Sequence, residues 1–407
     1  MNFWKEIFEG LIIALNAIRA NKMRSVLTTL GIIIGIVSVT MMATAIEGLD
    51  RKFAESASAF GADILYIQKF PWVGHDDFWT YRNRKDITLD VAEDIVRQSK
   101  YVDAVAPTAF SVKPTQYRDR IMNNTFTTGT TDQYIYASGT TLKDGRFFSQ
   151  EESAGGRPVC VIGANVEENL FPNEDPIGKM VKLAGMPHRV LGVFEKQGGL
   201  FGIFTSDNRI FIPMNGFTNQ FGSRRDIMIQ VRAVKGVEIE EVREELRGII
   251  RKSRHLTPSQ PDDFNINEQE LLTQAFQAMT LVIAGVGFFI TGLSLFVGGI
   301  GIMNIMFVSV TERTKEIGIR KAIGAKRRTI LLQFLIESSI ICLIGGLLGL
   351  AISYPLSLIA NQILPTVMPL SIVAISILIS LLVGVISGFL PAYRASKLDP
   401  VDALRYE

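Results

Sequence analysis

The feature that most constrains the fold of this 407-residue chain is the absence of charged residues from three long stretches. No Asp, Glu, Lys or Arg occurs in residues 25–46, 271–311 or 338–393. A bilayer core admits few charges, and about 20 apolar residues form one helical crossing. Residues 47–270 have the charge content of a soluble protein and are long enough for one or two folded domains. The chain is therefore predicted to be a membrane protein with a large soluble insert.

These stretches predict four membrane-spanning helices. Residues 271–311 could hold a two-span hairpin, but a hairpin would move the basic segment that follows to the other side of the membrane. They are therefore predicted to form one helix of about 60 Å, whose outer part is a stalk. Residues 338–393 contain helix-breaking positions between Asn361 and Pro369 and hold two spans. The predicted segments are span 1 at 25–46, the stalk plus span 2 at 271–310, span 3 at 330–354, a short external loop at 355–370, and span 4 at 371–390.

Lysine and arginine predict the orientation of these spans. Cytoplasmic loops are enriched in both residues, and here they gather near the two chain ends and in the loop 311–329. Both termini, this loop and the tail 391–407 are therefore predicted to be cytoplasmic, and residues 47–270 extracytoplasmic. Residues 1–24 carry apolar side chains on one helical stripe, which indicates an amphipathic helix in the inner headgroup layer. An ordinary helix packed on the first span is an equal alternative.

The extracytoplasmic insert is predicted to be an α+β domain made of two βαβ units. Two such units can pack into one split α/β layer. In the first unit, the helix is expected to open at Asp90, whose side chain could cap it together with Glu93. The predicted elements are a strand at 62–69, the helix and a strand at 102–110 in the first unit, and a strand at 226–234, a helix at 238–252 and a strand near 263–267 in the second.

Between the two units, residues 112–225 are predicted to be a β-rich insertion. A turn at 184–187 joins two of its strands, and one short helix starts near Ala164. The apolar, glycine-rich loop 198–204 could contact a partner or the membrane, or fold back onto its own sheet. The predicted strands of the insertion are 158–162, 180–183, 189–194 and 210–213.

The sequence lacks the motifs of an enzyme or a nucleotide site. No G-x-x-x-x-G-K-[ST] occurs, and the segment from Gly318 to Lys326 has the wrong spacing, with Arg327 where a phosphate loop needs Ser or Thr. Cys160 and Cys342 fall in the insert and in the third span and cannot pair, and the three histidines show no metal-ligand spacing. No catalytic, cofactor or metal site is predicted on this chain, so another chain would have to bind any ATP and Mg.

The segments Ser309–Lys326 and Phe334–Ser338 resemble the signature of MacB/FtsX-type ABC transporter permeases. The tail Pro391–Arg405 and the segment Asn21–Gly35 are similar to the same family, as is the turn Asp175–Lys179. The resemblance covers essentially the whole chain. MacB itself carries a nucleotide-binding domain ahead of the first span, so this chain resembles the split form, in which a separate subunit is the ATPase.

The resemblance implies a permease of the bacterial cytoplasmic (inner) membrane that works with a separate ABC ATPase and forms a homodimer, or a heterodimer with a similar permease. Motion of the ATPase would be passed through the membrane to the external domains (mechanotransmission), to drive export of a substrate from the periplasm or outer leaflet. A periplasmic adaptor and an outer-membrane exit duct are further candidate partners, and no nucleic acid is expected. The alternatives are a lipoprotein-extracting permease and an FtsX-like transducer that activates a cell-wall hydrolase.

The ATPase-coupling site is predicted at residues 312–325, as a short helix that presses into a groove on the ATPase. Glu316 and Arg320 would supply ionic contacts, and the Ile317/Ile323 pair apolar ones. The alternative is that the basic residues only hold the loop to anionic headgroups. The predicted coupling residues are Glu312, Arg313, Glu316, Ile317, Gly318, Arg320, Lys321, Ile323, Gly324 and Ala325, with Asp399, Pro400 and Val401 as an accessory contact.

Two further features concern the spans. Small-xxx-small pairs allow close helix packing, and three pairs of glycines have this spacing. Glu337 is the acidic residue expected at membrane depth, where a carboxylate is a candidate functional group. It could instead reach the inner interface or pair with Arg327 or Arg328. The predicted packing glycines are Gly31, Gly35, Gly345, Gly349, Gly384 and Gly388.

Overall fold

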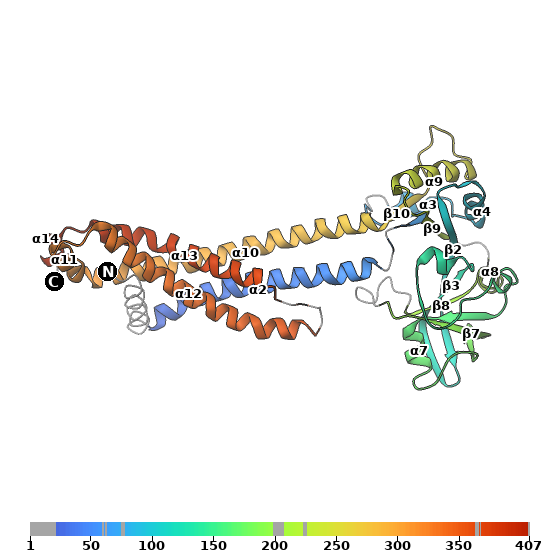
Figure 1. Cartoon of the computed structure of the whole chain (residues 1–407), viewed down its shortest axis with the longest axis horizontal. Helices are drawn as coiled ribbons and strands as arrows, with labels where there is room; N and C mark the ends of the chain where they lie inside the picture. The colour runs from blue at the N-terminus through green and yellow to red at the C-terminus, as the bar shows by residue number, and fades with distance from the viewer. Residues whose placement is uncertain are drawn as a thin grey trace. The chain divides into compact units, whose positions relative to one another are not determined.

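The computed structural model describes residues 22–58, 61, 63–74, 78–197, 207–222, 226–362, 366 and 368–405. The predicted glycine-rich loop, and the predicted amphipathic helix apart from its last three residues, lie outside these ranges. The chain divides into two compact units, a helical unit of residues 1–52 with 278–407 and an α+β unit of residues 53–277. Each is described by itself, and Figure 1 gives the labels of the elements.

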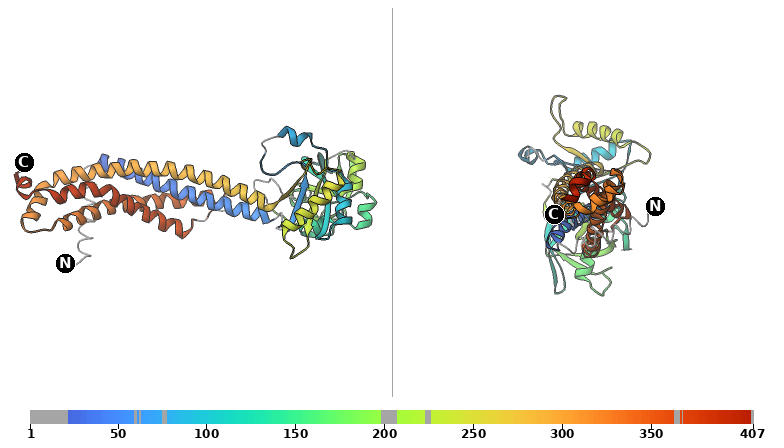
Figure 2. Two further views of the ribbon diagram at one scale, coloured as in Figure 1. Left: turned by 90° about the horizontal axis from the view of Figure 1, so that it is seen from above. Right: turned by 90° about the vertical axis from the view of Figure 1, so that its left-hand side faces the viewer.

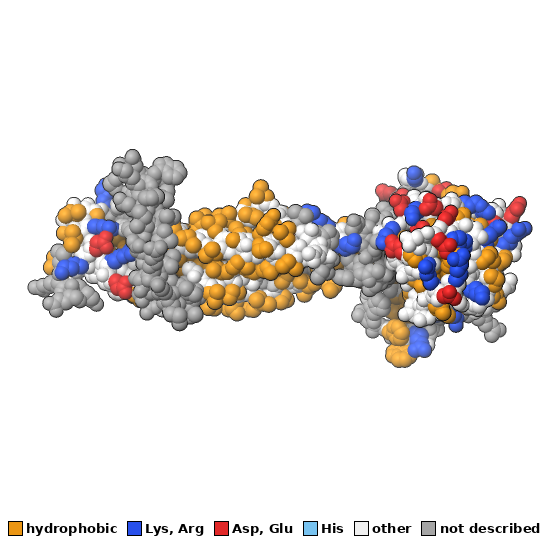
Figure 3. Space-filling view, turned by 90° about the horizontal axis from the view of Figure 1, so that it is seen from below, with side chains coloured by type: hydrophobic (Ala, Val, Ile, Leu, Met, Phe, Trp, Pro, Cys, Tyr) orange, Lys and Arg blue, Asp and Glu red, His pale blue; other side chains and the backbone are white. Residues whose placement is uncertain are grey.

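Among the residues that the structure describes, four helices are long and apolar enough to cross a membrane, as predicted. The second of them runs without a break over 44 residues, in agreement with the prediction of one helix rather than a hairpin. On the face that Figure 3 shows, hydrophobic side chains cover the middle of the helical unit, and charged side chains gather at the end where α11 and α14 lie. The helices are α2 (Lys22–Ser58), α10 (Gln269–Glu312), α12 (Arg327–Ala360) and α13 (Leu370–Lys397), with the short helices α11 (Thr314–Ala322) and α14 (Pro400–Arg405).

Glycines bring the long helices into close contact. At each of the six predicted positions, an added Cβ would lie within 3.2 Å of an atom of a neighbouring helix. The α2 pair faces α10, the α12 pair faces Ile32 and Ile36 of α2, and the α13 pair faces α12. Sequence analysis missed Gly298 of α10, which lies directly against Gly31. Because glycine has no side chain, the helix backbones can approach closely at these points.

The two predicted βαβ units are interleaved in one sheet. β9 lies between β1 and β2 and is antiparallel to both, so β1 and β2 are parallel to each other. β1 likewise lies between β9 and β10. The elements are β1 (Ile64–Gln68), α3 (Phe78–Asn83), α4 (Leu89–Gln98), β2 (Val102–Tyr117), β9 (Met228–Ala233), α9 (Ile239–Ser253) and β10 (Asn265–Glu268).

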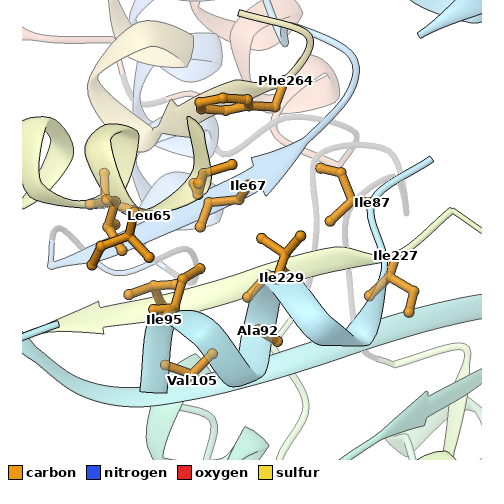
Figure 4. Close-up of a cluster of buried hydrophobic side chains, with 14 of the residues drawn as sticks. Leu65, Ile67, Ile87, Ala92, Ile95, Val105, Ile227, Ile229 and Phe264 are labelled. Atoms are coloured by element: carbon orange, nitrogen blue, oxygen red, sulfur yellow. The ribbon is translucent and has the colours of Figure 1, made fainter. Parts of the chain in front are cut away.

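Helices α4 and α9 cover one face of this part of the sheet. Their apolar residues join those of the strands in one buried cluster, which includes Ile95 of α4, Leu246 of α9 and Ile229 of β9. Figure 4 shows the strand and α4 side chains of this cluster converging between the two layers. The apolar residues of α4 and α9 recur with the helical period and so lie on a single face of each helix, which explains this packing.

The insertion extends the same sheet. The strand order is β10-β1-β9-β2-β3-β8-β5-β7-β4, and β6 pairs with β2 and β7. The view from above in Figure 2 shows the strands and short helices of this unit gathered together. Two further apolar clusters fill it. The elements are β3 (Arg120–Thr130), α5 (Tyr134–Ser138), β4 (Leu142–Gly145), α6 (Gln150–Ala154), β5 (Val159–Ile162), α7 (Ala164–Leu170), β6 (Met180–Leu183), β7 (Met186–Phe194), β8 (Arg209–Pro213) and α8 (Met214–Phe221).

One local prediction in this unit is wrong. Helix α4 begins at Leu89, with Thr88 as its N-cap residue and no side-chain cap hydrogen bond. The Thr88 hydroxyl donates to Asp90 instead, at 3.3 Å. Asp90 therefore lies in the first helical turn, where its charge favours the positive end of the helix dipole, and does not form the predicted cap with Glu93.

Candidate functional site

The predicted coupling segment forms a bent continuation of α10. Arg313 separates the two helices, with φ −104° and ψ 14°, and its backbone N–H still donates to the carbonyl of Ser309 at 3.1 Å. After α11, Gly324 has φ +98°, a left-handed conformation that suits glycine, and α12 starts three residues later. The segment is thus a rigid short helix with a bend at one end and a tight turn at the other.

One face of α11 is buried in the helical unit. Thr314, Ile317 and Gly318 are buried, and Ile317 belongs to the same apolar cluster as Phe334 of α12 and Ala395 of α13. Its side chain is only 3% exposed. Ile317 therefore faces inward in this structure and is not exposed for the ATPase contact that was predicted for it.

The opposite face of α11 is exposed and carries an apolar pair. Ile319 is 49% exposed and Ile323 is 81% exposed. They are four residues apart and so lie on one side of the helix. Ile323 was predicted from the sequence and Ile319 was not, although the i, i+4 spacing could have identified it. Lys315 and Glu316 are exposed as well, so this face combines apolar and charged groups.

Lys321, predicted as a coupling contact, binds the end of α13 instead. Its ammonium group donates to the carbonyls of Ser396 and Leu398, each at 2.6 Å. The last carbonyls of a helix have no partner within it and attract cations. Burial, together with the charge of Arg327, lowers the pKa of Lys321 below that of an ordinary lysine.

Glu337 pairs with Arg313, and not with Arg327 or Arg328 as one prediction proposed. One terminal nitrogen of Arg313, Nη1, lies 3.2 Å from both carboxylate oxygens. The Glu337 side chain is 2% exposed and that of Arg313 26%. Arg327 and Arg328 are exposed at the start of α12. Arg313 is thus directed toward α12, and its role as a direct ATPase contact is not supported.

A further polar contact joins α11 to α12. Arg320 donates to the side-chain oxygen of Gln333 at 2.7 Å and to Glu316 at 2.5 Å. The predicted accessory residues form the start of α14, where the Asp399 carboxylate accepts from the N–H of Val401 at 2.9 Å. Helix α14 contacts α11, and the Val401 side chain is exposed.

We use the name docking face for Lys315, Glu316, Ile319, Ile323 and Val401. It is the exposed side of α11 together with the neighbouring end of α14. It combines two isoleucines and a valine with charges of both signs. In the ranges that the structure describes, no group of three or more His, Cys, Asp or Glu side chains is arranged to hold a metal ion.

In the part of the chain that the structure describes, four apolar helices, with an α+β domain between the first two in the sequence, indicate a multi-pass membrane protein. Residues 25–249 match the family model of the MacB-like periplasmic core domain, and residues 288–400 that of the FtsX-like permease C-terminal region. The chain therefore belongs to the MacB/FtsX-like family of ABC transporter permeases, which confirms the predicted family and fold class.

Relatives align over nearly the whole chain. The macrolide export ATP-binding/permease protein MacB of Bdellovibrio bacteriovorus is 36% identical over 412 residues, covering 99% of this chain and 62% of MacB. The chain thus spans about three-fifths of such relatives. The uncharacterized ABC transporter permease YknZ of Bacillus subtilis is 32% identical over 408 residues, covering 98% of this chain and 100% of YknZ. The periplasmic region of MacB from Actinobacillus actinomycetemcomitans is similar to 56% of this chain and is itself covered to 98%, with a TM-score of 0.46 at 20% identity.

Proposed function

We propose that this chain is the permease subunit of a MacB-type ABC transporter driven by a separate ATPase subunit. In this proposal it is a homodimer in the bacterial cytoplasmic membrane, with both termini and α11 in the cytoplasm and the α+β unit outside. ATP-driven motion of the ATPase moves α11 and is transmitted to the external domains, which drive export of a substrate. ATP and Mg are bound by the ATPase.

The observation that supports this proposal best is the two-sided character of α11. Its inner face is held by buried residues and by polar contacts with α12 and α13, whereas the docking face is exposed. An anionic headgroup layer would repel the exposed carboxylate of Glu316, which lies on the same free side of α11 as the exposed Ile319 and Ile323. Their exposure favours a groove in a partner protein.

Substitution of the two exposed isoleucines tests the docking face. Burial of one isoleucine side chain contributes about 1.5–3 kcal/mol. Loss of both in Ile319→Asp with Ile323→Asp should therefore weaken association with the ATPase by about 100-fold or more, at about 1.4 kcal/mol per tenfold change. The permease should still insert and fold, because both positions are exposed. Ile317 is unsuitable for this test, since its replacement would disturb the buried cluster.

The control is Val96→Asp, which introduces one aspartate at a 67% exposed aliphatic residue of α4. Co-purification with its partner ABC ATPase, followed by ATP hydrolysis of the complex, measures the outcome. The control should retain both properties. If the double variant binds and activates the ATPase like the unchanged protein, the docking face is not the ATPase contact.

A further inference from the structure

The ion pair between Arg313 and Glu337 lies at a mechanically important point. Arg313 is the bend between α10 and α11, and Glu337 is about three turns into α12. The carboxylate is almost fully buried, and Arg313 supplies its ion-pair partner at 3.2 Å. The pair therefore ties the bend of one helix to a fixed point on another.

Stability alone does not account for this pair. Removing two charges from water is costly, and a buried ion pair can often be replaced by apolar residues without loss of stability. Charged groups at membrane depth are expensive and are retained where they have a function. An apolar pair would fill the same space without holding α11 in one direction. The directional contact is what the charges add.

The remaining contacts of α11 show what the pair restrains. At the far end of α11, Arg320 binds Gln333 of α12 and Lys321 binds the carbonyl end of α13. With Arg313 held as well, both ends of α11 are attached to the helices behind it. Without that attachment, α11 could turn about its bend, and a push on the docking face would be absorbed locally.

We propose that Arg313 and Glu337 are positioning residues that make α11 and α12 move as one body, so that displacement of α11 reaches the outer end of α12. This inference rests on the proposed function, because it requires a partner that moves α11. The ion pair does not itself contact the ATPase in this scheme. Its loss should leave ATPase binding intact and uncouple it from movement of α12.

The test uses a fluorescent reporter at the outer end of α12. Gln362 is exposed there, and Gln362→Cys can be labelled with bimane after Cys160 and Cys342, both buried, are replaced by alanine. The full-length permease is reconstituted with its ATPase in nanodiscs, and bimane emission is compared before and after trapping with ATP and vanadate. Glu337→Gln, which keeps the shape of the side chain, is compared with Arg328→Gln, which removes an exposed charge nearby.

Glu337→Gln should lose most of the nucleotide-dependent change in emission. Its ATPase association should stay within about twofold of the unchanged protein, and Arg328→Gln should behave like that protein in both assays. The exchanged pair, Arg313→Glu with Glu337→Arg, should recover the emission change. This recovery distinguishes positioning from a general loss of packing, and it provides a second variant if Glu337→Gln folds poorly.

The outcomes separate the two proposals. If the unchanged permease does not bind the ATPase, the proposed function fails, and this inference fails with it. If the ATPase binds but emission does not respond to nucleotide, or if Glu337→Gln responds fully, only the inference is overturned. It is also overturned if Glu337→Gln loses ATPase association in parallel with emission and the exchanged pair recovers neither.

Discussion

Replacement of Gly384 by alanine should destabilise the helical unit, although alanine is the better helix former. A Cβ at this position of α13 would lie 2.6 Å from the Cα of Ser339 and 3.0 Å from the carbonyl oxygen of Ser338. Carbon atoms in contact are normally about 3.5–4.0 Å apart, so α12 and α13 must separate by about 1 Å. The obstructing atoms are backbone and cannot rotate away. Such overpacking costs about 1–3 kcal/mol.

The appropriate comparison is Gly292→Ala in α10, where a Cβ would have no neighbour within 4 Å. Alanine is favoured over glycine in a helix interior by about 1 kcal/mol, and this gain applies to both variants. The difference between the two unfolding free energies therefore isolates the packing effect and should be about 1–3 kcal/mol. Titration with SDS in mixed micelles, followed by circular dichroism, measures it. Equal stability of the two alanine variants would refute the close contact between α12 and α13.

Three further predictions concern other parts of the chain. The hydrogen bond from Arg146 lowers the pKa of Glu152 to about 2, so Glu152→Gln should be about 1–2 kcal/mol less stable at pH 7, a value limited by the solvent exposure of Arg146. Because Arg146 stabilises only the ionised carboxylate, the difference in unfolding free energy between the two proteins, measured with urea, should shrink below about pH 4.5 and vanish near pH 2. A difference that stays constant with pH would contradict this. The side chain of Arg254 is 4% exposed and pairs with Asp263. The substitution Arg254→Ala should therefore lower the unfolding free energy by about 3 kcal/mol, again measured by urea unfolding. A cysteine at Lys326 should resist an impermeant maleimide in intact cells and react after permeabilisation; ready labelling of intact cells would contradict the proposed orientation.

The sequence was most informative where one physical constraint dominates. Charge is excluded from a bilayer core, so the charge-free stretches predicted the four long helices. The period of apolar residues predicted α9 and the core strands of the α+β unit. The strand β3 was missed because it is rich in Thr and Asn and its register is set by β2 and β8, which are distant in the sequence. Its turn also contains Arg118 at φ 49° in place of the glycine that would have marked it.

The candidate site could be located from the sequence but not resolved into its two faces. The segment 312–325 stood out because it is too charged for a bilayer and resembles a family signature. Which isoleucine faces inward depends on the bend at Arg313, and that bend has no proline or glycine to indicate it. The partner of Glu337 was assigned by proximity along the chain to Arg327 or Arg328. The bend instead brings Arg313, 24 residues away, against the carboxylate.

The connection of β10 to α10 has a mechanical consequence for the α+β unit. β10 ends at Glu268 and passes directly into α10, and Glu268 pairs with Leu65 near the start of β1, the strand that follows α2. In the same unit, Phe53 of α2 stacks on Phe276 of α10 with ring centroids 4.1 Å apart. Lengthwise sliding of these helix ends would load the β1–β10 hydrogen bonds together in shear, whereas splaying would peel them open one at a time. A sliding motion of the helix ends should therefore be transmitted into the sheet, whereas a splaying motion should only separate β10 from β1 at the edge of the sheet.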